Sequence, residues 1–139
     1  MGKLTREITT ERLNNMGLTI LCISQVSSAQ VTRNLVLEQA GYQVVATDDA
    51  GQAERIFRDD HISAVIFGET MRADERIELG KAFKQLKPSV PIVFLYKMNG
   101  FRVPPGIADE QVEFLSGPKL LLHALARVLG HGQKQGGDE

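Results

Sequence analysis

Short apolar runs alternate with amphipathic segments along most of the chain. Five runs rich in β-branched and aromatic residues are separated by segments whose apolar residues recur with helical spacing. The predicted strands are Leu18–Ile23, Tyr42–Thr47, Ile62–Phe67, Pro91–Tyr96 and Gln111–Leu115. The predicted helices are Ala29–Ala40, a segment that ends near Phe57, Asp74–Leu86 and Lys119–Leu129. Strands that alternate with helices predict an α/β fold, a parallel sheet covered by helices on both faces.

Polar residues and glycines mark the ends of the predicted helices. The serines of "SQVSS" are suited to cap the first helix, and Asp48 or Asp49 the second. Asp49 and Gln52 have the spacing of a capping box. Gly41 is placed to end the first helix in a left-handed conformation. The residues expected to face inward are Val31, Leu35 and Val36 on the first of these helices and Ile77, Phe83 and Leu86 on the third.

One connection breaks the alternation. The segment 97–110 contains two glycines and a Pro-Pro pair, so the helix expected between the fourth and fifth strands is short, distorted or missing. Residues 1–17 form a polar N-terminal extension, in which we expect a short helix. Residues 18–130 form one domain, and 131–139 read as a flexible tail.

Composition and charge narrow the class of protein. The chain has 139 residues, 42% of them hydrophobic, with a net charge of −1, which gives no electrostatic case for nucleic acid or an anionic membrane as the main partner. Cys22 is the only cysteine, so there is no internal disulfide, as fits a reducing compartment. No apolar run approaches membrane-spanning length. We therefore expect a soluble, cytoplasmic domain.

Three stretches of the sequence resemble a known family. "ILCI…LVLEQAGYQVVATDDAGQA", "LKPSVPIVFLY" and "EFLSGP" are similar to the receiver domains of two-component response regulators, and the resemblance extends from about Thr19 to Leu129. It implies a flavodoxin-like fold, a doubly wound sheet of five parallel strands in the order 2-1-3-4-5.

The resemblance also implies where a phosphorylation pocket would lie. The two acids that hold magnesium in the family correspond to Ser24 and Gln25, and the phosphoacceptor aspartate corresponds to Gly68. The switch Ser or Thr corresponds to Tyr96, and the lysine before the proline corresponds to Gly117. All five positions depart from the family pattern. The aromatic switch position is kept in kind, as Phe114.

These departures remove the groups that the family's chemistry needs. An aspartyl phosphate requires a carboxylate nucleophile, and magnesium requires oxygen ligands with negative charge. We therefore expect a degenerate receiver, a pseudo-receiver of a phosphorelay system that binds neither metal nor cofactor, is not an enzyme and acts by protein–protein interaction. Glu69, next to Gly68, would point away if it continued the strand and inward if the strand had ended, so a rescue of the pocket by Glu69 stays open. Lys97 and Lys119 are interpreted as surface lysines.

The face through which such a module would bind is predicted from the unusual connection. Receivers commonly signal through their fourth helix, fifth strand and fifth helix, and here a Pro/Gly-rich loop takes the place of that helix. The candidate interaction face consists of Phe101, Val103, Pro104, Pro105 and Phe114. The partner is a protein of unknown identity, and self-association stays open. By analogy with the family, the bond between Gly117 and Pro118 is expected to be cis.

Other functions have less support from the residues. The hydroxyl-rich loop Ser24–Ser28 precedes a helix and offers an alternative, a flavodoxin-like binder of a phosphate-containing small ligand, but it lacks the glycines of a phosphate-binding fingerprint. No nucleophile elbow, paired carboxylates or P-loop supports an enzyme. The three histidines have no metal-ligand spacing, and Cys22 is interpreted as a small buried hydrophobe.

Overall fold

The structure, a computed structural model, describes residues 10–97 and 103–130. Its centre is a five-stranded parallel sheet in the order β2-β1-β3-β4-β5. The strands are β1 (Thr19–Ile23), β2 (Gln43–Thr47), β3 (Ala64–Phe67), β4 (Ile92–Tyr96) and β5 (Glu110–Glu113). The predicted fold class and strand order are confirmed.

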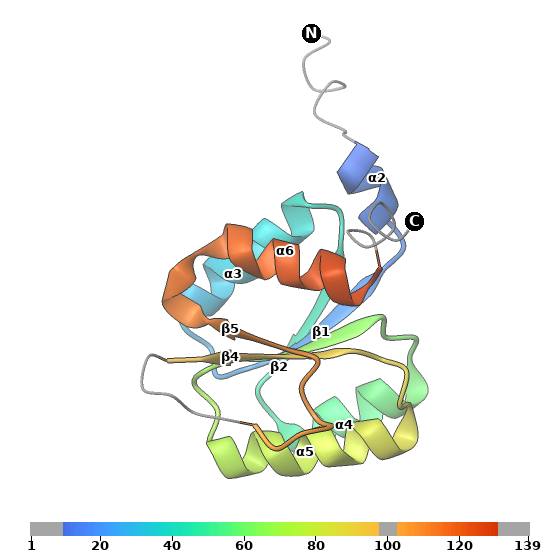
Figure 1. The fold of residues 1–139 in the computed structure, drawn as a ribbon, viewed down its shortest axis with the longest axis vertical. Coiled ribbons are helices and arrows are strands. Elements are labelled where there is room, and N and C mark those ends of the chain that lie inside the picture. The colour runs from blue at the N-terminus through green and yellow to red at the C-terminus, as the bar shows by residue number, and fades with distance from the viewer. Residues whose placement is uncertain (1–9, 98–102, 131–139) are drawn as a thin grey trace, which may run out of the picture.

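Helices cover both faces of the sheet (Figure 1). The helices α3 (Ser28–Gln39) and α6 (Pro118–Val128) lie on one face, and α4 (Ala50–Asp59) and α5 (Ala73–Leu86) lie on the other. A short helix α2 (Thr10–Asn15) precedes β1, and a 3₁₀ turn, η1 (Phe114–Ser116), follows β5. None of the helices in the described part of the chain has the length and apolar character needed to cross a membrane.

The sheet separates two hydrophobic cores. On the α4–α5 face, Phe57 stacks on Phe83 with ring centroids 4.1 Å apart, and Phe67 lies 4.9 Å from Phe94. On the α3–α6 face, Leu37 and the apolar side of α6 cover the other side chains of the central strands. Because β1, β3 and β4 are buried on both faces, their sequences are continuous apolar runs rather than alternating ones.

Two predictions about which helix residues face the sheet are wrong, one in α3 and one in α5. In α3 the sheet buries Gln30 and Leu37, whereas Val31 and Leu35 are each 52% exposed. Val31, Leu35 and Val36 have helical spacing, but that spacing defines a stripe beside the face that contacts the sheet. Leu86 is 43% exposed because it is the last residue of α5, one turn beyond the buried Phe83.

The helix ends follow their predicted caps, with one difference. Ser27 caps α3 by accepting from the Gln30 N–H at 3.1 Å, and Gly41 after this helix has a φ of +107°. Asp49 caps α4 by accepting from the Gly51 N–H at 3.0 Å. Asp49 and Gln52 do not form a capping box, because the side-chain Oε1 of Gln52 instead accepts from the Thr47 hydroxyl at 2.6 Å.

The connection before β5 contains no helix in its described residues, 103–109. Ile107 anchors it in the core, 5% exposed, against α5 at Gly80. The Asp109 carboxylate accepts from the Ile92 N–H and from Lys84 Nζ, both at 2.8 Å. These contacts hold residues 103–109 against α5 and β4.

The N-terminal extension packs on the domain through α2. The Asn15 side chain, 2% exposed, donates to the Ala40 carbonyl at the end of α3 at 2.8 Å. The short helix expected in this extension is thus present. The predicted tail, 131–139, lies outside the described residues.

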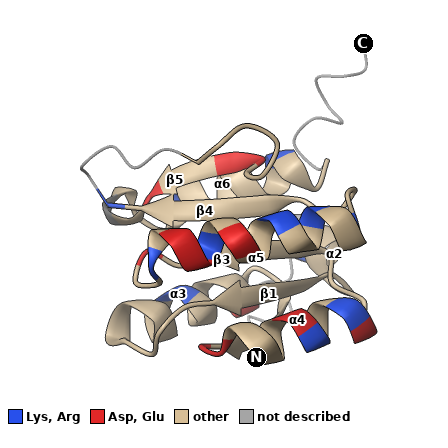
Figure 2. Cartoon of the chain, turned by 90° about the horizontal axis from the view of Figure 1, so that it is seen from below, with Lys and Arg blue, Asp and Glu red and all other residues tan. Residues whose placement is uncertain are grey.

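The outer surface of α4 and α5 carries mixed charge (Figure 2). Each helix carries acidic and basic residues, with the acids of α5 in its first half and its lysines in the second, and some form ion pairs within a helix, such as Arg58 with Glu54 at 3.1 Å. The two helices therefore present no surface of a single sign.

Candidate functional site at the carboxyl ends of the strands

Ser24 and Gly68 lie side by side where β1 and β3 end. The two strands pair in register at Ile23 and Phe67, and the Gly68 N–H donates to the Ile23 carbonyl at 2.8 Å. A Cβ atom added at Gly68 would lie 2.4 Å from the Ser24 Cβ, a distance that real Cβ atoms essentially never show. Position 68 has no room for a side chain unless the loop after β1 moves.

A buried hydroxyl pair joins the loops that follow these two strands. Ser24 is 2% exposed, and its hydroxyl lies 3.1 Å from the hydroxyl of Thr70. The Thr70 hydroxyl oxygen also accepts from the Gln25 N–H at 3.0 Å, while the residue Gln25 itself is exposed. Two of the predicted positions are therefore tied to the loop after β3 by polar contacts.

Arg76 of α5 connects the ends of β3 and β4. It is 4% exposed, and its Nη1 donates to the carbonyl of Gly68 at 3.0 Å and to that of Leu95 at 2.6 Å. Burial lowers the pKa of Arg76, and the negative charge of Glu69 acts in the opposite direction. A buried cation thus contacts the backbone of Gly68.

Glu69 turns inward, because β3 ends at Phe67 and the alternation of strand side chains no longer applies. Its side chain is 3% exposed, and its Oε1 lies 3.4 Å from Nη1 of Arg33 in α3. Arg33 Nη2 in turn lies 3.3 Å from the place where a Cβ of Gly68 would be. The space beside Gly68 therefore holds an arginine and a carboxylate that interact with each other.

The remaining predicted positions lie toward the other edge of the sheet. Tyr96 ends β4 opposite Glu113 of β5, and Gly117 precedes α6 with a φ of +96°. The bond between Gly117 and Pro118 is trans, so the predicted cis bond is wrong. The physical reason is that Gly117 makes the turn with its left-handed backbone, and Pro118 begins α6, where its missing N–H is not needed.

The predicted interaction face is only partly exposed. Pro104 and Pro105 are exposed, whereas Val103 is half-buried against the α4–α5 core and Phe114 is half-buried against the α3–α6 core. Phe101 lies outside the described residues. Within the described ranges there is also no group of three or more His, Cys, Asp or Glu side chains placed to hold a metal ion.

The roles of Arg33 and Arg76 at this edge were not predicted from the sequence. Their spacing along the helix to residues that the structure buries explains where their side chains lie. Arg33 comes three residues after the buried Gln30 and four before Leu37, and Arg76 comes three and seven residues before the buried Leu79 and Phe83. A charged residue at that spacing lies on the inward face of its helix.

Comparisons with known proteins were made at the levels of sequence and structure. No family model matches the sequence, and no curated protein matches it. Solved structures do match. A CheY-like receiver domain from Methanospirillum hungatei has a TM-score of 0.71 at 18% identity, over 85% of this chain and 98% of that one. A putative response regulator from Chloroflexus aurantiacus has a TM-score of 0.74 at 19% identity, over 81% and 98%.

A third match is the receiver domain of a sensor histidine kinase from Pseudomonas aeruginosa, whose structure has magnesium coordinated in the active-site cleft. Its TM-score is 0.73 at 18% identity, over 82% of this chain and 98% of that one. The fold is thus the doubly wound, flavodoxin-like class. More particularly, the chain has the fold of response-regulator receiver domains over most of its length.

Proposed function

We propose that this chain is a pseudo-receiver, a signalling module of the two-component type that acts in the cytoplasm by protein–protein contact, without phosphoryl transfer and without catalysing a reaction. The main observation behind the proposal is the packing at the end of β3. Gly68 stands where the fold's phosphoacceptor would be, and Ser24 fills the space that a carboxylate there would need.

The charges around Gly68 support the same conclusion. A receiver needs acids to hold magnesium, but Ser24 and Gln25 are neutral, and two arginines approach the position instead. Magnesium is a hard cation that selects negatively charged oxygen ligands, so a site with neighbouring guanidinium groups disfavours it. The inward Glu69 carboxylate is paired with Arg33, which opposes its use as a substitute nucleophile.

The experiment is an amide NMR titration with magnesium and then with beryllofluoride, which mimics the phosphoryl group. We expect no saturable shifts at Ser24, Gln25, Gly68 or Gly117, and no mass increase after incubation with acetyl phosphate. Saturable shifts at these amides with both additions, or a phosphorylated Glu69, would contradict the proposal.

We place the protein contact at the loop before β5. Pro104 and Pro105 are exposed next to the anchored Ile107, so they form a rigid apolar edge. Replacing both prolines with serine should abolish capture of the partner, with the melting temperature nearly unchanged because neither side chain is buried. Val26, 76% exposed after β1, provides the control, since Val26→Ser should leave capture intact. If both variants capture the partner equally well, the contact does not lie at Pro104 and Pro105.

The hydroxyls of Ser24 and Ser27 argue against the phosphate-binding alternative at Ser24–Ser28, because both make internal contacts. The Ser27 hydroxyl oxygen caps α3, and the Ser24 hydroxyl interacts with Thr70 and with the Gln25 carbonyl. These internal contacts explain both serines without a ligand, so we do not propose this function.

A further inference from the structure

A pocket opens between α3 and α6, on the face of the sheet opposite α4 and α5. Its volume is about 340 Å³, and it is bounded by α3, the ends of β4 and β5, and the first turns of α6. Its walls are mainly apolar and include Ala29, Val36, Val112, Phe114, Pro118 and Leu121, while Ser28, Thr32 and Glu113 also line it. Ligand sites typically have such walls together with a few placed polar groups.

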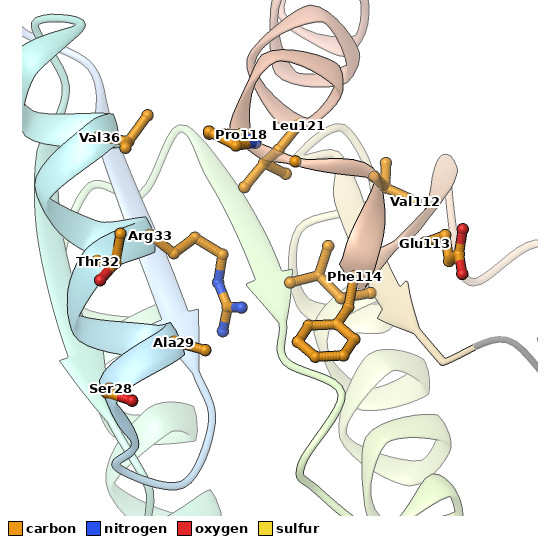
Figure 3. A pocket seen from close by; sticks show the side chains of 12 residues that line it. Ser28, Ala29, Thr32, Arg33, Val36, Val112, Glu113, Phe114, Pro118 and Leu121 are labelled. Atoms are coloured by element: carbon orange, nitrogen blue, oxygen red, sulfur yellow. The ribbon is translucent and has the colours of Figure 1, made fainter.

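Arg33 is the cation of this pocket. In Figure 3 its side chain extends from α3 into the space in front of Phe114, and the carboxylate of Glu113 points away from α3. The Arg33 side chain is 13% exposed, so its charge is largely removed from water. The pocket therefore combines an apolar wall with one inward positive charge.

Within the described residues, the ion pair of Arg33 with Glu69 is a long one. Its contact with Glu69 is 3.4 Å long, whereas a good charge-assisted hydrogen bond is about 2.7–2.9 Å. Glu69 also interacts electrostatically with the buried Arg76. The charge of Arg33 is largely removed from water, and a buried positive charge is costly unless an anion pairs closely with it.

We propose that the pocket binds a small molecule with an apolar body and one anionic group, the body packed between α3 and α6 and the anionic group paired with Arg33. The volume favours a small molecule, because it is near the lower end of the range of ligand pockets, roughly 300–1,000 Å³. The charge favours an anion, and the apolar walls disfavour a molecule that is polar throughout.

The direct test is an NMR titration of the whole chain with 4-phenylbutyrate and, in parallel, with 4-phenylbutan-1-ol, which has the same body without the charge. The acid should cause saturable shifts at the amides of Ala29, Thr32, Phe114 and Leu121. The alcohol should bind roughly tenfold more weakly, as expected for the loss of one charge-assisted hydrogen bond.

Substitutions then separate the charge from the apolar wall. Arg33→Met keeps much of the apolar stem and should remove the preference for the acid, whereas Arg55→Met, the same change on an exposed position of α4, should not. Ala29→Phe, at an exposed position on the pocket wall, should block both compounds. Val31→Phe, on the same helix outside the pocket, should block neither.

Glu69→Gln provides a readout that a merely structural role of Arg33 would not produce. Removing the internal carboxylate leaves Arg33 without its ion-pair partner, so the affinity for 4-phenylbutyrate should rise while that for the alcohol stays the same. A melting curve of the variant confirms that it is folded.

Several results would overturn the proposal. One is the absence of saturable shifts at the pocket amides, or shifts confined to the exposed apolar residues Val26, Val31 and Leu35. Another is equal binding of acid and alcohol that Arg33→Met does not change. If neither compound binds but Ala29→Phe abolishes the binding of a protein partner, the occupant is a protein side chain and the small-molecule assignment is wrong.

Discussion

The geometry at Gly68 depends on a single missing Cβ atom. Ser24 occupies the space that a side chain at position 68 would need, and its hydroxyl is fixed by Thr70. The two residues are therefore coupled, because Ser24 fills the space beside Gly68. An aspartate placed alone at position 68 would collide with Ser24.

This coupling predicts the stability of Gly68→Ala. We expect the variant to be destabilised by about 1–3 kcal/mol, the usual cost of overpacking a buried site. In the double variant with Ser24→Gly the clash is absent, so the loss should be smaller than the sum of the two single losses. Urea denaturation of the four proteins measures both quantities. Additive losses would show that Ser24 is not the obstacle.

Cys22 gives a second prediction at the level of one residue. Burial raises the pKa of its thiol from 9.0 to about 12, with a smaller opposing effect of Arg33. Between these two values the folded chain keeps the proton and the unfolded chain releases it, so this group makes stability fall as pH rises. The thiol should resist iodoacetamide in the native state and react after unfolding, as mass spectrometry would detect. Rapid native labelling would contradict its burial.

The single residues that sequence reasoning missed share a physical cause. Arg33, Glu69 and Arg76 meet only because β3 ends at Phe67 and because two helices on opposite faces reach the same strand end. Local sequence contains no information about that meeting. The inward position of Arg76 was available from its spacing to the apolar Leu79 and Phe83, whereas that of Arg33 was not, because the inward face expected for its helix was a different one.

At the level of elements, the loop before β5 is anchored to α5 by one close approach. A Cβ on Gly80 would lie 2.6 Å from the Cγ2 atom of Ile107, which is 5% exposed. A glycine inside a helix normally costs about 1 kcal/mol relative to alanine. Here that cost is offset by the packing of Ile107 against α5, which anchors the loop.

Gly80→Ala should therefore destabilise the protein, although alanine has the higher helix propensity. We expect a lower melting temperature and a net destabilisation of about 1 kcal/mol, because displacing Ile107 outweighs the gain in helix propensity. Gly51→Ala in α4 is the matched control, since its Cβ would make only an ordinary contact at 3.6 Å and alanine should stabilise there. If both variants are stabilised to the same degree, the loop is not held through Gly80.

More of the molecule's architecture than of its candidate site could be predicted from the sequence. The buried runs of β1, β3 and β4 and the intervening helical spacing identify a parallel sheet without any knowledge of contacts. The strand order followed from the family resemblance alone. The pocket between α3 and α6 could not be predicted, because it depends on how far apart two helices on one face lie.

The position of β5 at the edge of the sheet predicts uneven stability across the molecule. β5 has one strand neighbour and four residues, of which only Val112 is buried, whereas β3 is buried throughout between two strands. Amides of β3 should exchange with solvent only through global unfolding, and those of β5 through local opening at a lower free energy. Since β5 also forms a wall of the pocket, a bound ligand should slow its exchange selectively.

Native-state hydrogen exchange at increasing urea concentration measures this difference. The exchange free energy of Ile66 should fall with urea as steeply as that of global unfolding, and that of Val112 should fall less steeply at low urea and join it at high urea. The control is Val93 of β4, which is buried between two strands and should follow Ile66. If Val112 follows Ile66 at every urea concentration, the sheet opens as one unit and the wall of the pocket is as rigid as its centre.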